Sequence, residues 1–172
     1  NEMAETAQVT MMAETAQVTS SIPEALHRGP NELPFVPFGD GVKLQLLQVD
    51  IEGGLWIVRT RFEPGVTVQR HKHTGEVYAV TFSGAWKYLE YPDTINRAGS
   101  YLYEPAGSIH TLTTDIEGVT EVMDTWFAIR GANLNLNEAG EVESIVDAGS
   151  ILQQYYEECA KAGLPKPAVI GG

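Results

Sequence analysis

Residues 64–84 read PGVTVQRHKHTGEVYAVTFSG, with His71 and His73 two positions apart. Alternate residues of a β-strand point to the same face, so we expect both imidazoles on one side of a strand, about 7 Å apart along it. Residues 98–114 read AGSYLYEPAGSIHTLTT and contain His110. A neighbouring strand that brings His110 alongside would complete a set of three imidazoles, which suits iron, zinc, copper or nickel.

Glycines and a proline stand at fixed offsets from these histidines. In the first stretch, one glycine lies six residues before His71 and another lies eleven residues after His73. In the second stretch, a glycine lies six residues before Pro105, which opens a Pro-Ala-Gly turn, and His110 follows the glycine of that turn by three residues. An HxH pair alone is a weak signal. The complete set of spacings, however, resembles the two motifs of the cupin superfamily, which implies an all-β jelly-roll barrel with a metal site.

The chain departs from these motifs at two positions. The place of the usual glutamate holds Val77, and Glu76 is one residue early. A one-residue shift turns a strand side chain to the other face, unless a bulge near Gly75 re-aims it. The last position of the second motif holds Thr114 instead of asparagine. We therefore expect a three-histidine site without the usual carboxylate, which argues against a closed structural zinc site with four protein ligands.

Composition limits the class of protein. A chain of 172 residues is long enough for one domain with a sizeable core. The net charge of -12 disfavours binding to nucleic acid or to an anionic membrane. Cys159 is the single cysteine, so no intrachain disulfide can form. With no apolar run of membrane length and no signal-peptide pattern, we expect a cytoplasmic protein.

Three regions are expected along the chain. An extended N-terminal arm occupies residues 1–33, the barrel residues 34–146, and a helix with a tail residues 147–172. The arm contains MAETAQVT twice, at residues 3–10 and 12–19, which looks like a duplicated start and receives no functional role.

Short apolar runs separated by turn residues predict the strands of a sandwich or barrel. They cover residues 42–49, 54–63, 76–82, 85–91, 100–104, 110–114 and 119–131. Near the C-terminus, Asp147 or Ser150 can cap a helix that runs to about Ala162.

Alternation within these strands suggests which side chains face the interior. Trp86, Tyr88 and Glu90 share one face of their strand, and Tyr103 and Trp126 are further candidates for a cavity wall. Such a wall favours a flat aromatic substrate, although the same aromatic residues are equally suited to filling the barrel.

Three carboxylates are candidates for a catalytic base or an extra metal ligand. They are Glu90, Glu104 and Glu76, and strand alternation favours Glu90. Burial raises the pKa of a carboxyl group beside a metal, whereas the cation lowers it, so the sequence does not choose among them.

The resemblance narrows when the longer runs are considered. RHKHTGEVYAVTFSGAWKYLEY, AGSYLYEPAGSIHTL, WFAIRGANLNLNEAGEV and DAGSILQQYYEECAKAGLP together resemble the 2,4'-dihydroxyacetophenone dioxygenase family of cupins, across roughly residues 34–165. This resemblance implies an Fe(II) enzyme with histidine ligands that cleaves a small aromatic hydroxyketone with O2, giving 4-hydroxybenzoate and formate. Cupins commonly associate, so a homodimer or homotetramer is expected.

Three alternatives stay open. A cupin dioxygenase that cleaves β-diketones would use the same metal site with a different pocket. A thiol dioxygenase would need an anchoring arginine, for which Arg59, Arg61, Arg70 and Arg97 are unplaced candidates. A non-catalytic cupin would bind a metal or a small ligand without consuming oxygen.

Overall fold

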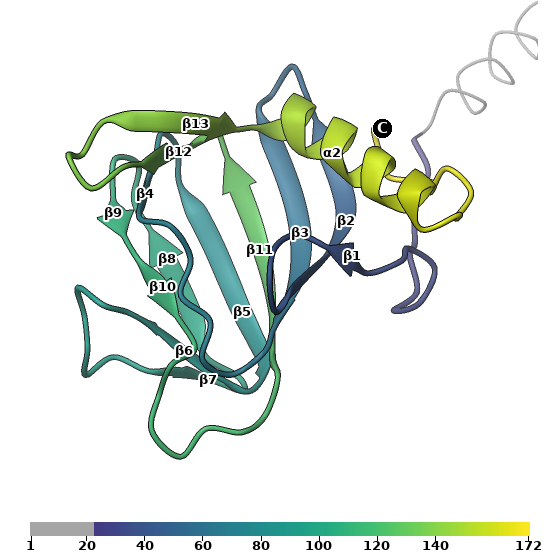
Figure 1. Cartoon of the computed structure of the whole chain (residues 1–172). Helices are drawn as coiled ribbons and strands as arrows, with labels where there is room; N and C mark the ends of the chain where they lie inside the picture. The colour runs from purple at the N-terminus through teal and green to yellow at the C-terminus, as the bar shows by residue number, and fades with distance from the viewer. Residues whose placement is uncertain (1–22) are drawn as a thin grey trace, which may run out of the picture.

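Three β-sheets and one helix make up the computed structural model, which describes residues 23–172 (Figure 1). The sheets have the strand orders β1-β2-β3-β11-β5-β8, β10-β6-β7 and β13-β12-β4-β9. All strand pairs within them are antiparallel. The expected all-β cupin barrel is therefore confirmed.

The strands of the six-stranded sheet are β1 (Val36–Pro37), β2 (Val42–Asp50), β3 (Leu55–Phe62), β5 (Val77–Ser83), β8 (Tyr101–Glu104) and β11 (Met123–Arg130). The two smaller sheets contain β4 (His71–His73), β6 (Ala85–Tyr88), β7 (Asn96–Arg97), β9 (Ile109–His110), β10 (Leu112–Thr113), β12 (Asn133–Leu136) and β13 (Val142–Val146).

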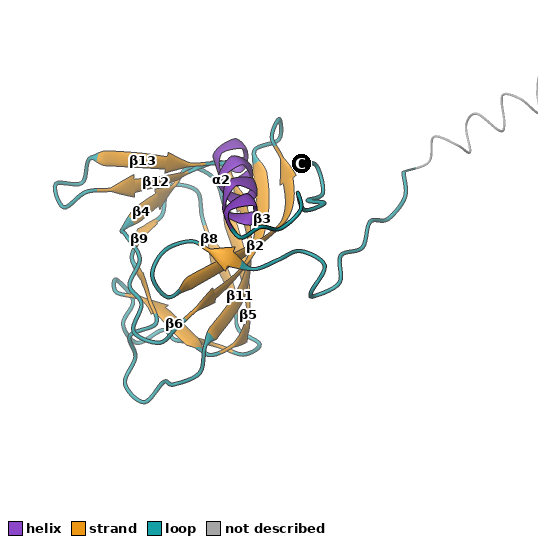
Figure 2. Ribbon diagram, turned by 45° about the vertical axis from the view of Figure 1, so that its right-hand side comes forward, coloured by secondary structure: helices purple, strands orange, loops and turns teal. Residues whose placement is uncertain are grey.

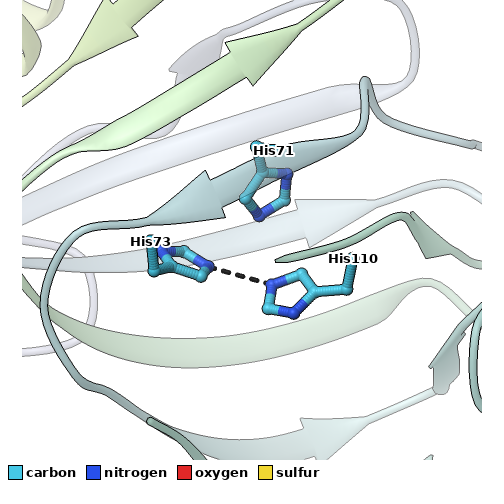
Figure 3. Close-up of side chains that lie close together, drawn as sticks. All are labelled: His71, His73 and His110. Atoms are coloured by element: carbon cyan, nitrogen blue, oxygen red, sulfur yellow. Dashed lines mark hydrogen bonds between the residues drawn. The ribbon is translucent and has the colours of Figure 1, made fainter. Parts of the chain in front are cut away.

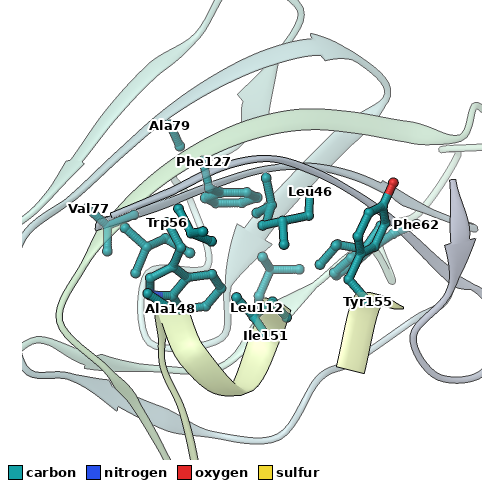
Figure 4. Packing of buried hydrophobic residues seen from close by; sticks show 14 of the residues in the cluster. Leu46, Trp56, Phe62, Val77, Ala79, Leu112, Phe127, Ala148, Ile151 and Tyr155 are labelled. Atoms are coloured by element: carbon teal, nitrogen blue, oxygen red, sulfur yellow. The ribbon is translucent and has the colours of Figure 1, made fainter. Parts of the chain in front are cut away.

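Strand β3 shows how alternation builds the barrel interior. Trp56, Val58, Thr60 and Phe62 are all buried, and all four line a partly open cavity. The residues between them point to the opposite face of the sheet, as the period of two requires. The inner face carries a continuous apolar cluster that includes residues from β2, β5 and β11 (Figure 4).

The strand boundaries differ from the expected ones in two informative places. The run of residues 110–114 is not one strand, because it divides into β9 and β10, which pair with β4 and β6 in different sheets. The hairpin of β12 and β13 was not expected at all. Its strands, NLNL and VESIV, are only four and five residues long, so their alternation is too short to give a clear strand signal.

Helix α2 (Ala148–Lys161) follows β13 and lies against β1 and β2 (Figures 1 and 2). The expected cap is confirmed, because Asp147 accepts a hydrogen bond from the backbone N–H of Ser150 in a capping box. Ile151, Tyr155 and Cys159 are buried on the inner face of the helix. The Tyr155 hydroxyl donates to the Pro34 carbonyl at 2.6 Å and so ties the helix to the segment that precedes β1.

The repeated MAETAQVT segments, and with them most of the proposed arm, lie outside the described residues. Among residues 23–172, none of the helices has the length and apolar character needed to cross a membrane.

A pair of glycine substitutions tests how tightly the barrel is packed. Gly84 and Gly99 both have a positive φ, of 69° and 87°. An added Cβ at Gly84 would lie 2.6 Å from the Met123 Cα, whereas nothing lies within 4 Å at Gly99. We expect Gly99→Ala to lower the free energy of unfolding by about 1–2 kcal/mol, through backbone conformation alone. Gly84→Ala adds overpacking and should cost about 1–3 kcal/mol more in urea unfolding. Equal losses would contradict this packing.

Candidate functional site

Strand pairing brings the three histidines together. His71 and His73 belong to β4, which lies between β12 and β9, and His71 is the direct register partner of His110 on β9. Residues that face each other across two strands share a face of the sheet, so all three imidazoles point into the same space (Figure 3). The structure thus places the three histidines as the spacing predicted.

The ring geometry is that of a converging donor set. Each pair of imidazole centroids is 4.8 Å apart. One ligand atom from each ring lies within 4.8 Å of the other two. The Nε2 atoms of His73 and His110 are 3.0 Å apart (Figure 3). Nitrogen ligands bind a metal at about 2.0–2.1 Å, so two ligands 3.0 Å apart can reach the same ion.

Burial keeps two of the rings neutral. Burial lowers the pKa of His71 to about 4, while the negative charge of Glu90 acts weakly in the opposite direction. The pKa of His110 is lowered to about 3, by burial first and then by the charges of His71 and His73. The Nδ1 of His71 donates to the Gln69 carbonyl at 3.0 Å, which leaves its Nε2 free. Neutral imidazoles with a free Nε2 are in the form that binds metals.

A carboxylate lies beside the histidines. Glu104 is almost completely buried, with its Oε2 3.0 Å from the Nε2 of His73 and its Oε1 3.6 Å from the Nε2 of His110. Despite these short distances, neither carboxylate oxygen takes part in a hydrogen bond. A buried carboxylate without a donor is costly, so this group is suited to face a cation or a substrate proton.

The residues present fit a divalent metal. Without a cation, the 3.0 Å contact of the two Nε2 atoms requires one ring to carry its single proton on Nε2 and to donate it to the other ring. A cation at the same place satisfies both nitrogens and offsets the charge of the unpaired Glu104. The three histidines could therefore hold a metal, with Glu104 next to it.

The position of Glu104 corrects the expectation of a site without a carboxylate. Strand β5 pairs with β8 so that Val77 and Glu104 are direct partners. The motif has a glutamate at the position of Val77. Glu104 places a carboxylate next to that position, on the adjacent strand and on the same face.

The other two candidate carboxylates are not part of this buried group. Strand β6 ends at Tyr88, so alternation does not continue to Glu90, which is exposed and accepts a hydrogen bond from the backbone N–H of Thr111 at 2.9 Å. Glu76 forms an ion pair of 2.8 Å with Arg130. Its pKa is lowered, first by a backbone hydrogen bond and then by Arg130. Sequence alternation favoured Glu90, whereas the geometry favours Glu104.

A partly open cavity of about 310 Å³ adjoins the histidines. His71, His73 and Glu104 form part of its wall, and residues of β3, β11 and α2 form much of the rest. No lysine or arginine within residues 23–172 lines it. Arg59 and Arg61 instead bind Asp124, at 2.7 and 3.1 Å. The described cavity thus lacks the anchoring cation that a thiol dioxygenase would need.

The predicted aromatic wall is only partly in place. Tyr88 lines the cavity and stacks on His110 with the ring centroids 3.9 Å apart. Trp86 is fully buried but does not line the cavity. Tyr103 is 52% exposed on the outer face of its sheet, where it lies against Tyr78. These positions correct the expectation that Trp86 and Tyr103 face a ligand.

Trp126 is also outside the cavity, and its neighbour Phe127 takes the inner position. Trp126 is the direct partner of Arg59 on β3, so both lie on the outer face of the sheet, opposite to Trp56 and Phe62. Sequence reasoning also missed the cavity residues Trp56, Phe62 and Asn133. The alternation of β3 contained the signal for Trp56 and Phe62, whereas nothing in the sequence pointed to Asn133.

Comparisons with known proteins agree with the fold. The model of the ChrR cupin-like domain family matches residues 23–128. A protein of unknown function with a cupin-like fold from Ralstonia eutropha JMP134 is 32% identical, with a TM-score of 0.77 over 87% of this chain and 94% of that one. An RmlC-like cupin protein from the same organism is 25% identical, with a TM-score of 0.79 over 88% and 97%.

A more distant structural relative is an acetylacetone dioxygenase from Acinetobacter johnsonii. It is 17% identical, with a TM-score of 0.68 over 80% of this chain and 94% of that one, a likeness that concerns the fold alone. No curated protein matches the chain.

Removal of one histidine should abolish tight metal binding. We expect His71→Ala, His73→Ala and His110→Ala to lose at least tenfold in affinity for a divalent metal, since two imidazoles are left. His27→Ala is the matched control, because His27 is the one histidine outside the cluster. Calorimetric titration of the metal-free proteins and metal analysis after dialysis measure the difference. Unchanged metal content in the three variants would overturn the ligand assignment.

The metal-free protein should be sensitive to mild acid. The pKa values of about 4 and 3 for His71 and His110 lie below the ordinary value near 6.5, so the unfolded chain binds more protons below that pH. The contribution of the neutral rings to the free energy of unfolding is complete above pH 6.5 and decreases as the pH falls towards 4. Urea unfolding at several pH values should show a smaller decline for the double variant His71→Gln/His110→Gln. The same decline in both proteins would assign the effect to other groups.

Proposed function

The chain belongs to the ChrR cupin-like domain family, and from that premise we propose that it is an Fe(II)-dependent dioxygenase acting on an aryl α-hydroxyketone. The bond between the carbonyl carbon and the hydroxymethyl carbon breaks, and each carbon receives one oxygen atom from O2. With 2,4'-dihydroxyacetophenone, the products are 4-hydroxybenzoate and formate. O2 is the oxidant, so the reaction needs no external reductant.

One observation carries the proposal. His71, His73 and the buried, unpaired carboxylate of Glu104 line one wall of a cavity whose other walls are apolar or neutral, and His110 completes the set of converging imidazoles. A chelating, polar end of a small ligand suits that wall, and an uncharged body suits the rest. A ligand that is polar at one end and aromatic at the other combines these properties.

His71, His73 and His110 would hold the iron, which supplies a Lewis acid for the ketone and hydroxyl oxygens and activates O2. The carboxylate of Glu104 is the proton acceptor. Its unpaired oxygens lie beside the histidines, where a substrate hydroxymethyl group would approach. Abstraction of a proton from that group by Glu104 raises the electron density of the carbon that O2 must attack.

The aromatic residues of the cavity support an aryl substrate. Trp56, Phe62, Tyr88 and Phe127 all line it, and Tyr88 lies directly on the ring of His110. Flat rings pack well against such walls, and the apolar lining restricts water near the reacting end. The volume of about 310 Å³ is at the small end for ligand sites, which suits a single-ring compound.

Oxygen consumption by the Fe(II)-loaded protein tests the proposal. With 2,4'-dihydroxyacetophenone, we expect one O2 to be consumed for each 4-hydroxybenzoate and formate formed. The metal-free protein is the control for uncatalysed oxidation. Absence of uptake with a full iron site would remove the hydroxyketone assignment. Uptake with 2,4-pentanedione instead would favour a β-diketone dioxygenase, and uptake with neither would favour a metal-binding module.

A pair of glutamate variants tests the proton acceptor. We expect Glu104→Gln to lower kcat by about 10²–10⁴-fold with iron retained, because an amide cannot accept the proton. Glu90→Gln should change kcat by less than about threefold, since its side chain is exposed and bound to Thr111. Kinetics and iron analysis of both variants give the comparison. The reverse order of effects would return the role to Glu90.

A further inference from the structure

We infer that Asn133 determines specificity by accepting a hydrogen bond from the α-hydroxyl of the ligand, so that the site favours hydroxyketones over ketones without this group. The inference rests on the proposed function, because it concerns the substrate of the same site. It adds a residue for which neither motif provides a position.

Asn133 lies beside the histidines on the other side of β4. Strand β12 pairs with β4 so that Asn133 is the direct partner of His73. Direct partners on antiparallel strands have Cβ atoms about 4.5–5.5 Å apart on one face, and both residues line the cavity. The Asn133 side chain therefore borders the end of the cavity at which the histidines converge.

The side-chain oxygen of Asn133 is buried and has no hydrogen-bond partner. A buried acceptor left unpaired loses its hydrogen bonds to water without replacement, so most buried acceptors in native structures have a partner. Because this acceptor adjoins a cavity, a ligand that brings a donor removes this loss when it binds.

Asn135 provides an internal comparison. It lies two residues further along β12, faces the same cavity and is the direct partner of His71. Its side-chain nitrogen, however, already donates to the Ser144 hydroxyl at 2.9 Å. The two asparagines share a strand and a face, and each lies opposite one histidine. They differ in that the Asn135 side chain is held by Ser144, whereas the Asn133 oxygen is buried without a partner.

The chemistry of the surroundings identifies the missing partner as a neutral donor. The described cavity has no lysine or arginine, so no protein cation within it can approach the Asn133 oxygen. A carbonyl oxygen of a diketone is itself an acceptor and would leave Asn133 unpaired. A hydroxyl group donates and satisfies it.

The position along the cavity selects the α-hydroxyl and not a hydroxyl on the ring. Asn133 is at the histidine end, whereas Ile151 and Gln154 of α2 line another part of the same cavity. A ligand whose ketone and α-hydroxyl oxygens face the histidines places its aromatic ring away from them. The donor within reach of Asn133 is then the α-hydroxyl.

Binding measurements on the zinc-loaded protein test this without turnover, since zinc has no redox chemistry. Dissociation constants are measured by calorimetry for 2,4'-dihydroxyacetophenone and for 4'-hydroxyacetophenone, which lacks only the α-hydroxyl. The proteins are the wild type, Asn133→Leu and the matched control Asn135→Leu. Asn133→Ala is the second variant at this position should leucine prevent folding. Zinc content and melting temperature show that each protein is intact.

We expect Asn133→Leu to reduce the preference for the α-hydroxyl ligand about tenfold, and Asn135→Leu to change it less than twofold. A double-mutant cycle of protein and ligand isolates this coupling from any general loss of packing. Equal weakening of both ligands would overturn the inference, because it would assign Asn133 a structural role or a contact with the shared ketone. A third ligand, 2-hydroxyacetophenone, keeps the α-hydroxyl and lacks the ring hydroxyl. If the effect of Asn133→Leu depended on the ring hydroxyl instead of the α-hydroxyl, the inference would also be overturned.

The experiments distinguish failure of the proposed dioxygenase function from failure of the inference about Asn133. Coupling at Asn133 without oxygen uptake by the iron protein would leave Asn133 as a ligand-recognition residue and remove the dioxygenase assignment. Oxygen uptake with no coupling would keep the dioxygenase and remove Asn133 from specificity. Absence of hydroxyketone binding to the zinc-loaded wild type would overturn the inference about Asn133.

Discussion

The pairing of β4 with β9 on one side and β12 on the other is the constraint on which the site depends. It makes His110 the partner of His71, and it places Asn133 and Asn135 opposite His73 and His71. A slip of one residue in β4 would turn both of its histidines to the other face. The turn that begins at Pro105 holds this register, because the backbone N–H of Gly107 donates to the His73 carbonyl and the N–H of His73 donates to the Ser108 carbonyl.

The carboxylate of the site shows why a motif read along one strand is incomplete. The motif assigns glutamate to the position of Val77, and the chain has none there. In the sheet, one of the two direct cross-strand partners of that position is Glu104, which lies 27 residues later in the sequence, and the other is Ile129. A sheet therefore permits a side chain to be replaced by its cross-strand partner. Only the register between β5 and β8 reveals the replacement, and that register is set by tertiary packing.

Local patterns predicted the elements whose signals are local. The spacing of the three histidines, the alternation of β3 and the Asp147 cap were all correct, because each depends on neighbouring residues alone. Glu90 was favoured by extending an alternation past the end of β6, whereas Trp126 was a candidate whose face is set by the pairing of β11 with β3. Strand β12 alternates asparagine and leucine over only four residues, which is too short to identify a strand or to show that its asparagines face a cavity.

The electrostatics of the site link metal binding to folding of this end of the barrel. Glu104 places a buried carboxylate without a hydrogen-bond donor in a chain that already has a net charge of -12. The lowered pKa values of His71 and His110 keep those rings uncharged, so they do not compensate it. A divalent cation does, and it satisfies the facing nitrogens at the same time. Because the unfolded chain does not hold these four groups together, a metal held by them would bind the native state preferentially and would stabilise it in proportion to the logarithm of its concentration above the dissociation constant. The features that make the metal-free site costly are thus the same ones that give it affinity for a cation.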